Sequence, residues 1–370
     1  MTDKLSNLVD VVGSFLLPDE LLQARAQYSA GAIDYDSFKR IEDKAIEQLV
    51  EHQTGVGLKE VTSGEFRRND WDKDFWFGLE GISCERVDSG HLYQPLDSFT
   101  DLVRFSGRIA YNPSHPFFDD FAYLYKITNG RAQCRQTIPS PANLYLEILS
   151  TTADGRPAPV YADSQSLLAD IAEAYNKTLK QFYNLGCRHL QFDDTACGLL
   201  SDKTYTKRLL QGGIDPIHLH EQLIALFNNS IACLPTDMEL SLYISGGDTI
   251  VPEWGTQNYV DSIMPKVLSQ VRVAKFFIPF DMGRDSQLEV LRHIPLGKKV
   301  VLGLVDAHSP FADKIERVRP AFEKTAQYIQ RQNLSVSPKS GFKLTSFATR
   351  GLTYEDQWNK IAQISAVMLK

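Results

Sequence analysis

The feature that most constrains the fold is an alternation of short strand-like runs with longer helical segments. Eight runs of five to eight residues are rich in apolar and β-branched side chains. They span residues 8–15, 59–65, 133–139, 188–194, 239–245, 273–280, 299–305 and 334–338. Between most of them lie segments with apolar residues three and four positions apart, such as 166–187. This alternation is typical of parallel strands joined by crossover helices.

Eight strand and helix units in 370 residues predict an α/β fold, a (β/α)8 TIM barrel formed by a single domain from 1 to 370. The segment 71–131, between the second and third strands, is interpreted as an insertion. Because it is rich in aromatic residues and in Gly, Pro and Asp turn signals, we expect a hairpin and a short helix there. The same alternation also permits a doubly wound open sheet, which is the alternative.

The composition favours a small-molecule partner. The formal net charge is -7, the pI is near 5.7, and no run of Lys and Arg forms a basic footprint, which disfavours a nucleic-acid partner. No apolar stretch approaches the roughly 20 residues of a membrane span, and residues 1–8 lack the pattern of a signal peptide. The sequence therefore predicts a cytoplasmic protein without a membrane partner, and it leaves a homo-oligomer open. The five cysteines contain no CxxC pair, which disfavours a disulfide framework or a zinc ribbon.

Polar residues gather at the ends of several strand-like runs. They are Gly13 and Ser14, Gly64 and Glu65, Asp193 and Asp194, and Asp306, His308 and Ser309. In a TIM barrel the active site lies at the carboxyl ends of the strands, so these residues are candidates for one site. The three carboxylates could hold an ammonium group, bind a ring through paired hydrogen bonds, or act as acid and base.

The same residues also have structural interpretations. An Asp at a helix start satisfies free backbone N–H groups, and His308 precedes Ser-Pro, a pattern that suits a helix start. A histidine tuned by neighbouring carboxylates could instead donate a proton near neutral pH. The motif HLHE at 218–221 is not interpreted as a metal site, because side chains two positions apart in a helix point about 200 degrees apart.

Taken together and in order, seven segments resemble the catalytic barrel of cobalamin-independent methionine synthase, and more closely its short single-domain relatives. They are VGSF (12–15), TSGEFRRND (62–70), TIPSPA (137–142), LQFDDT (190–195), GKKVVLGLVDAHSP (297–310), SPKSGF (337–342) and LTYEDQW (352–358). No single segment is specific, but their order covers essentially the whole chain. The resemblance implies a TIM barrel that binds homocysteine and a methylfolate and transfers the methyl group to the homocysteine sulfur.

The resemblance also assigns residues. It implies that His308 assists proton delivery, and it gives His308, Glu65 and Asp193 as catalytic candidates. The substrate-binding candidates are Gly13, Ser14, Glu65, Asp193 and Asp194. The Asp-Asp-Thr at 193–195 departs from the Asp-Glu-Pro of the full-length enzyme and is similar to the short relatives, so the resemblance leaves the folate contacts open.

In that family a zinc ion holds the substrate thiol as a thiolate, which a free thiol with a pKa near 8.5 supplies poorly at neutral pH. The family's ligand positions fall here on Tyr243, Ser245, Pro279 and Ser340. Proline has no ligand atom, neutral hydroxyls are poor zinc ligands, and no Cys or His stands close to these positions in the sequence. The sequence therefore predicts a lost zinc site, with Ser340 in the place of a ligand, and it assigns no cofactor.

Three functions stay open. The first is a methionine-synthase-like methyltransferase for a homocysteine-like amino acid, with a folate as candidate donor and with His308 as a base or Cys197 as an unexpected metal ligand. The second is a metal-free enzyme on the same barrel, decarboxylase-like or acting on another small acid. Its additional polar groups would be Asp281, Arg284, Asp248 and Arg67. The third is a non-catalytic amino-acid-binding protein that kept the pocket.

Overall fold

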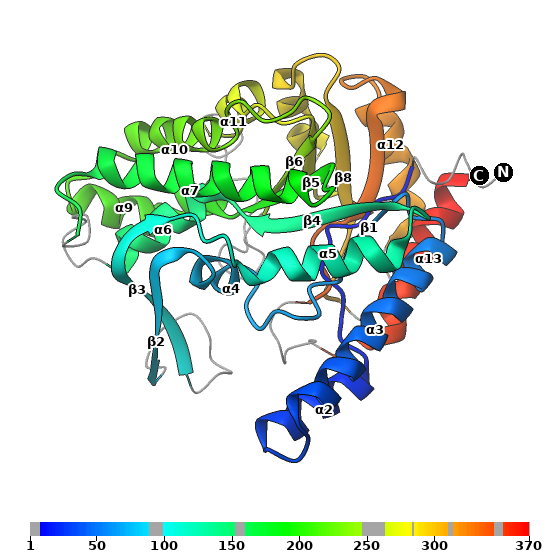
Figure 1. Cartoon of the computed structure of the whole chain (residues 1–370). Coiled ribbons are helices and arrows are strands. Elements are labelled where there is room, and N and C mark those ends of the chain that lie inside the picture. The colour runs from blue at the N-terminus through cyan, green and yellow to red at the C-terminus, as the bar shows by residue number, and fades with distance from the viewer. Residues whose placement is uncertain are drawn as a thin grey trace.

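The strands form one curled parallel sheet with helices along its outside (Figure 1). The computed structural model describes residues 8–88, 99–151, 160–245, 263–282, 285–309, 314–343 and 351–369. The strands of this sheet are β1 (Glu60–Val61), β4 (Gln133–Pro139), β5 (His189–Asp194), β6 (Glu239–Ile244), β7 (Lys275–Pro279), β8 (Lys299–Val305) and β9 (Leu334–Pro338). They neighbour one another in chain order, whereas a doubly wound sheet reverses its order midway. The predicted TIM-barrel fold is confirmed.

The first predicted strand, 8–15, occupies the eighth position without a regular ladder. A single parallel bridge joins Val9 to Val336 of β9, and the Asp10 N–H donates to the Val336 carbonyl at 2.9 Å. On its other side, the Phe15 N–H donates to the Gly64 carbonyl at 3.1 Å, just beyond β1. The segment therefore lies between β9 and the end of β1 and links the two edge strands.

The strands alternate between side chains that face the barrel interior and side chains that face the helices. In β5, His189, Gln191 and Asp193 contact residues of other strands across the interior. Leu190 and Phe192, between them, are fully buried in the main apolar core. Because successive side chains of a strand point to opposite faces, the apolar positions pack against the helices and the polar ones line the interior.

The interior has three levels along the barrel axis. Charged side chains lie at the amino ends of the strands. Above them, Val12, Tyr243, Phe277 and Val301 form a small apolar cluster that is separate from the main core. Polar residues at the carboxyl ends of the strands form the third level. The apolar cluster thus separates two polar regions.

The helices that cover the sheet are mostly those between consecutive strands. They are α2 (Asp19–Ser29), α3 (Tyr35–Gly55), α5 (Pro116–Thr128), α6 (Pro141–Thr151), α7 (Ser164–Asn184), α8 (Ala196–Ser201), α9 (Lys203–Gln211), α10 (Pro216–Ser230), α11 (Met264–Gln270), α12 (Val318–Thr325) and α13 (Tyr354–Leu369), with 3-10 turns η2 (Asp285–His293), η3 (Ile315–Arg317) and η4 (Arg331–Asn333). Side chains of Asp34, Asp163, Asp202 and Asp215 cap α3, α7, α9 and α10. Among the described residues, no helix has the length and apolar character needed to cross a membrane.

The segment 71–131 contains α4 (Lys73–Phe77), the strands β2 (Glu80–Asp88) and β3 (Phe99–Ala110), and α5. β2 and β3 pair antiparallel, which gives the expected hairpin, and this hairpin projects from the barrel in Figure 1. α5 packs beside β4 and completes the crossover from β1, so only the part before α5 is additional to the barrel. The organisation of 1–370 as a single domain stays a prediction.

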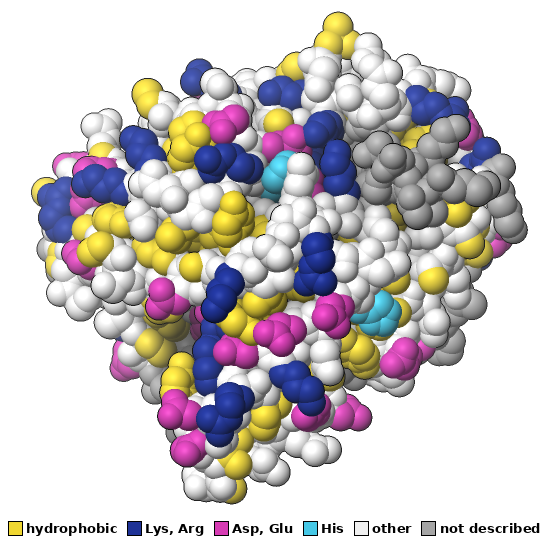
Figure 2. Space-filling model, turned by 45° about the vertical axis from the view of Figure 1, so that its right-hand side comes forward, with side chains coloured by type: hydrophobic (Ala, Val, Ile, Leu, Met, Phe, Trp, Pro, Cys, Tyr) yellow, Lys and Arg dark blue, Asp and Glu magenta, His cyan; other side chains and the backbone are white. Residues whose placement is uncertain are grey.

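Charges of both signs are interspersed on the surface shown in Figure 2. Lys and Arg side chains lie next to Asp and Glu side chains over this face. Among the described residues, exposed ion pairs such as Arg331 with Glu323 join side chains of opposite charge. This face has no extended basic patch of the kind that tracks a nucleic-acid backbone.

Candidate active site

Glu65 lies in the loop after β1, four residues beyond Val61, with its backbone in the left-handed region at a φ of 59°. Gly64, at a φ of 66°, makes the turn, and its N–H donates to the Thr62 hydroxyl at 3.1 Å. The Glu65 side chain is buried, with Oε1 accepting from the Thr137 hydroxyl at 2.9 Å and lying 3.2 Å from Nη1 of Arg68. The turn therefore directs this carboxylate toward β4.

Asp193 is the inward-facing aspartate near the end of β5. Its Oδ1 accepts from the Gln191 amide at 2.7 Å, and its carbonyl accepts from Ser140 N–H at 2.8 Å and from the Asn143 amide at 3.0 Å. Burial, followed by the charge of Glu65, raises the pKa of Asp193 to about 8. The charge of Glu65 thus reaches Asp193, and the raised pKa favours the protonated form of Asp193.

Asp194 faces the opposite side of β5. Its Oδ1 accepts from the N–H groups of Ala196 and Cys197, at 2.9 and 3.3 Å, at the start of α8. Burial raises its pKa, while the Ser140 hydroxyl and these N–H groups oppose the rise. These contacts are those of a helix cap, so the structure does not bring Asp194 to the Glu65 and Asp193 pair.

Ser14 is brought next to the loop that follows β9. Its carbonyl accepts from the Phe342 N–H at 3.0 Å, and a Cβ added at Gly341 would come within 2.0 Å of the Ser14 hydroxyl. Gly13 holds a φ of 143°, and its carbonyl accepts from the Thr62 hydroxyl at 2.6 Å. Ser14 therefore packs directly against the Gly341 backbone.

His308 contacts the same loop. Its Nε2 lies 2.9 Å from the Gly341 carbonyl and 3.3 Å from the Ser340 hydroxyl. A carbonyl oxygen only accepts, so the hydrogen-bond network assigns the proton to Nε2. The backbone N–H of His308 donates to the Asp306 carboxylate at 2.8 Å. Ser14, His308 and Ser340 thus meet around one loop at the carboxyl ends of the strands.

The other positions that the sequence resemblance matches to zinc ligands have different surroundings here. Tyr243 packs with Val12 and Phe277 in the interior apolar cluster. The Ser245 N–H donates to the Asp194 carbonyl at 2.8 Å. Pro279 is paired in register with Gly303 of the neighbouring strand. These three positions and Ser340 offer a phenol, two hydroxyls and no fourth donor, a set that does not fit zinc.

Four residues near the site were missed in the sequence. Thr137 and Gln191 occupy the same strand face as site residues, so the two-residue period of β4 and β5 could have indicated them. Arg68 lies three residues after Glu65, within the segment that carries the family resemblance. Lys343 donates to the carbonyls of Glu65 and Arg68 at 2.9 and 3.2 Å, and burial lowers its pKa to about 8. No sequence signal pointed to Lys343.

The residues considered for other chemistry lie elsewhere or outside the described ranges. Arg67 pairs with Asp43 of α3 and, at 3.1 Å, with Asp120 of α5. Asp281 is exposed after β7, and Asp248 and Arg284 lie outside the described residues. Burial raises the pKa of Cys197 well above its usual value, so its side chain is a thiol and a poor metal ligand. His218 and His220 lie in helix α10, as the sequence interpretation of HLHE assumed.

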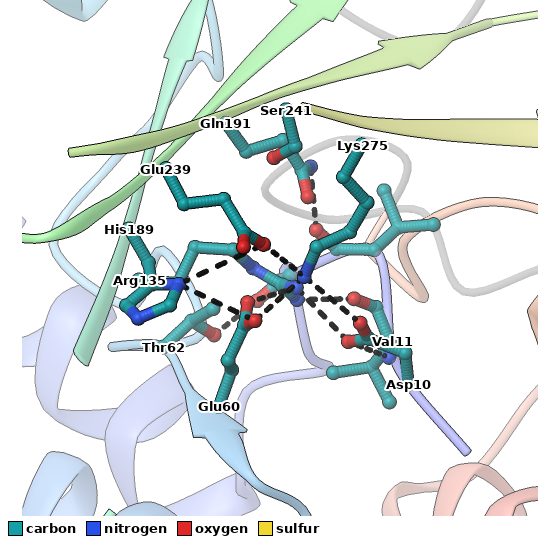
Figure 3. Close-up of polar contacts among 12 residues, drawn as sticks. Asp10, Val11, Glu60, Thr62, Arg135, His189, Gln191, Glu239, Ser241 and Lys275 are labelled. Atoms are coloured by element: carbon teal, nitrogen blue, oxygen red, sulfur yellow. Dashed lines mark hydrogen bonds and ion pairs between the residues drawn. The ribbon is translucent and has the colours of Figure 1, made fainter. Parts of the chain in front are cut away.

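The densest group of charged side chains lies at the amino ends of the strands (Figure 3). This basal ion cluster consists of Asp10, Glu60, Arg135, His189, Glu239 and Lys275. Ligand atoms of Glu60, His189 and Glu239 lie within 4.8 Å of one another, a spacing that a metal ion could use. The Lys275 ammonium is 2.6 Å from Glu60 Oε1 and 3.5 Å from Glu239 Oε1, so it already supplies the cation there. In a barrel this end contributes to stability rather than to catalysis.

Comparison with known proteins points to one family. A family model described as the catalytic domain of cobalamin-independent synthase matches residues 260–351. The uncharacterized protein YxjG of Bacillus subtilis is 29% identical over 96% of this chain and 92% of its own length. A methionine synthase of Pyrococcus furiosus is 22% identical over 96% of this chain and 91% of its own length.

The solved structures agree with the sequence matches. A Listeria monocytogenes protein provisionally assigned as a vitamin-B12-independent methionine synthase is 28% identical, with a TM-score of 0.74 over 97% of this chain and 95% of that chain. The shared fold and the near-complete coverage of both chains agree with the resemblance of the seven ordered segments. The chain is thus similar over almost its whole length to methionine synthases, and part of it matches the catalytic-domain model of the cobalamin-independent family.

Proposed function

We propose that the chain binds a homocysteine-like α-amino acid at the carboxyl ends of its strands and acts as an S-methyltransferase that does not hold the sulfur on zinc. The observation that carries the proposal is the pair formed by Glu65 and Asp193. Burial and the Glu65 charge raise the pKa of Asp193, which favours its protonated form. A ligand ammonium between the two carboxylates would replace that proton, because an opposite charge favours the ionised form.

The other end of the amino acid would lie near Ser14. Its hydroxyl lies beside the Gly341 backbone, and Thr62 and Phe342 hold the backbone of residues 13 and 14. A hydroxyl and nearby backbone N–H groups are suitable donors to a carboxylate. This arrangement supports a ligand with both an ammonium and a carboxylate, which distinguishes an amino acid from a simple acid or amine.

In the proposed site, no set of metal ligands would surround the sulfur of the homocysteine-like ligand. Tyr243, Ser245, Pro279 and Ser340 stand where the related family holds zinc, and they offer no thiolate, imidazole or carboxylate. In the methyl transfer, the sulfur attacks the methyl carbon of a folate-class N-methyl donor. A C–S bond forms and the N–CH3 bond breaks, while the thiol loses a proton and the donor nitrogen gains one. His308 is proposed to take up the thiol proton, and the imidazolium that forms then gives a proton to the donor nitrogen.

Calorimetric titration with L-homocysteine and L-methionine tests the amino-acid site. We expect binding by the wild type and a loss of affinity of at least about tenfold in Glu65→Gln and Asp193→Asn, since each removes a charged hydrogen-bond acceptor. Asp215→Asn is the matched control, because it makes the same chemical change at the exposed cap of α10. If neither ligand binds the wild type, the proposal fails.

Metal analysis and a methyl-transfer assay test the chemistry. Protein purified without chelator or histidine tag should contain well below one zinc per chain. It should form methionine from homocysteine and methyltetrahydrofolate at a rate that added zinc does not raise. Stoichiometric zinc would contradict the metal-free site, and binding without turnover would instead indicate an amino-acid-binding protein.

A further inference from the structure

Side chains, rather than a neighbouring strand, hold the backbone of residues 11–13. Three consecutive carbonyls accept hydrogen bonds from three different elements. The Val11 carbonyl accepts from Arg135, the Val12 carbonyl accepts from Gln191 at 2.7 Å, and the Gly13 carbonyl accepts from Thr62 at 2.6 Å. Figure 3 shows Arg135, Gln191 and Thr62 reaching toward this part of the chain. The position of Gly13 and Ser14 therefore depends on these side chains.

Gln191 alone among the three also contacts a site carboxylate. Its Nε2 lies 2.7 Å from the Val12 carbonyl and 2.7 Å from Oδ1 of Asp193, and the side chain is fully buried. Both neighbours are acceptors, and the amide NH2 group has two hydrogens to donate. The amide is therefore oriented with its nitrogen toward both, and one group joins the 8–15 segment to β5.

These contacts join the two halves of the proposed amino-acid site. Val12 directly precedes Gly13 and Ser14, where the ligand carboxylate would lie, and Asp193 would receive the ligand ammonium. We propose that Gln191 is a positioning residue that sets the separation of these two halves and favours the ionised form of Asp193. The inference rests on the proposed amino-acid site.

The electrostatic surroundings of Asp193 define what the amide contributes. Glu65, from the loop after β1, disfavours the Asp193 charge, while Arg68, from the same loop, and Arg135, from β4, favour it. The Gln191 hydrogen bond from β5 itself also favours it. Gln191 donates a hydrogen bond to the Asp193 carboxylate, so replacing Gln191 acts on the Asp193 charge directly.

The test is the pH dependence of methionine affinity, measured by calorimetry in the wild type, Gln191→Met and Gln191→Glu. Methionine affinity should rise with pH as Asp193 ionises. In Gln191→Met, which lacks the N–H donor to Asp193, the midpoint of this rise should lie about one pH unit higher. Gln191→Glu should shift it in the same direction, because a carboxyl donates at most one hydrogen and adds negative charge. Ser241→Ala is the control: Ser241 is paired with Gln191 in register, is buried, and bonds the Leu190 carbonyl instead of the site.

The outcomes separate the two proposals. If the wild type binds neither methionine nor homocysteine at any pH, the amino-acid site itself fails. If the wild type binds, but both variants lose affinity equally at every pH with the rise unmoved, Gln191 is merely structural and the inference is overturned.

A measurement on the wild type tests the inference even if the Gln191 variants do not fold. In protein labelled with 15N-glutamine, the Gln191 amide resonances should shift with the Asp193 titration and with methionine binding. Resonances that respond to neither would overturn the inference as well.

Discussion

Neutralising Glu60 should destabilise the barrel strongly, although this residue lies in the basal ion cluster and not among the candidate site residues. Glu60 is buried, with Oε1 at 2.6 Å from the Lys275 ammonium and Oε2 at 2.9 Å from the Arg135 guanidinium. Removing one partner of a buried ion pair costs about 3–5 kcal/mol. Asp10 stays 2.9 Å from Arg135 and 3.5 Å from Lys275. We therefore expect Glu60→Gln to cost about 3 kcal/mol, the lower end of this range, or roughly 4 °C in Tm for a chain of this size.

The reasoning also predicts a strong coupling between Glu60 and Lys275. Lys275→Met alone removes one cation from Asp10, Glu60 and Glu239 and should cost a similar amount. Asp10 and Glu60 keep Arg135, and Glu239 keeps Lys299. The double variant removes one charge of each sign, so its destabilisation should fall below the sum of the single values by about 2 kcal/mol. Urea unfolding of the four proteins measures this cycle. If the losses of unfolding free energy in the two single variants add up to the loss in the double variant, Lys275 is not the cation that compensates Glu60.

The pH dependence provides a second check on Glu60. Burial raises the Glu60 pKa, but Lys275 and Arg135 outweigh it, so the net shift is downward. A carboxylate with a depressed pKa contributes stability that is present above its unfolded pKa of about 4.3 and is lost as the pH falls below it. The stabilities of wild type and Glu60→Gln should therefore converge below about pH 4. Glu323→Gln, at an exposed pair with Arg331, is the control and should cost less than about 1 kcal/mol.

Two further substitutions test the local geometry at the carboxyl ends of the strands. Asp194→Ala should lower the free energy of unfolding in urea by about 1 kcal/mol, because it removes the cap of α8. Its methionine affinity should stay close to the wild-type value. A loss of affinity as large as that of Asp193→Asn would place Asp194 in the site after all. Gly341→Ala should displace Ser14 and weaken methionine binding, since the added Cβ would come within 2.0 Å of the Ser14 hydroxyl. Gly55→Ala is the control, because Gly55 has open space around it, and this variant should bind methionine normally. Equal methionine affinities of the two variants would contradict the close contact.

The strand positions could be predicted because the local pattern and the fold agree. Runs 133–139, 299–305 and 334–338 coincide with β4, β8 and β9. The first run, 8–15, has strand-like composition but only one bridge, because side chains satisfy its carbonyls. A local pattern cannot reveal bonds made by side chains about 50 to 180 residues away.

The site was predicted only in part because its carboxylates were grouped by sequence position. Asp193 and Asp194 are adjacent in the chain, but the two-residue period of a strand places one in the interior and the other at a helix start. Applying that period would have separated them and indicated Gln191 as well. Lys343 could not be found this way, because its contacts with the Glu65 and Arg68 carbonyls depend on loop geometry. The zinc-free interpretation and the cytoplasmic location stay predictions.

The three interior levels explain how the barrel can keep two carboxylates close together at one end. Glu65 has a left-handed backbone, which costs about 1–2 kcal/mol in a residue other than glycine, and its charge disfavours ionisation of Asp193. Opposite charges in the basal ion cluster compensate one another, and the apolar cluster of Val12, Tyr243, Phe277 and Val301 lies between that cluster and the site. Unfavourable electrostatics are thus confined to the end where a ligand can relieve them. An ammonium group there would turn the repulsion between Glu65 and Asp193 into two attractions, which makes this pair the source of amino-acid selectivity in the proposed function.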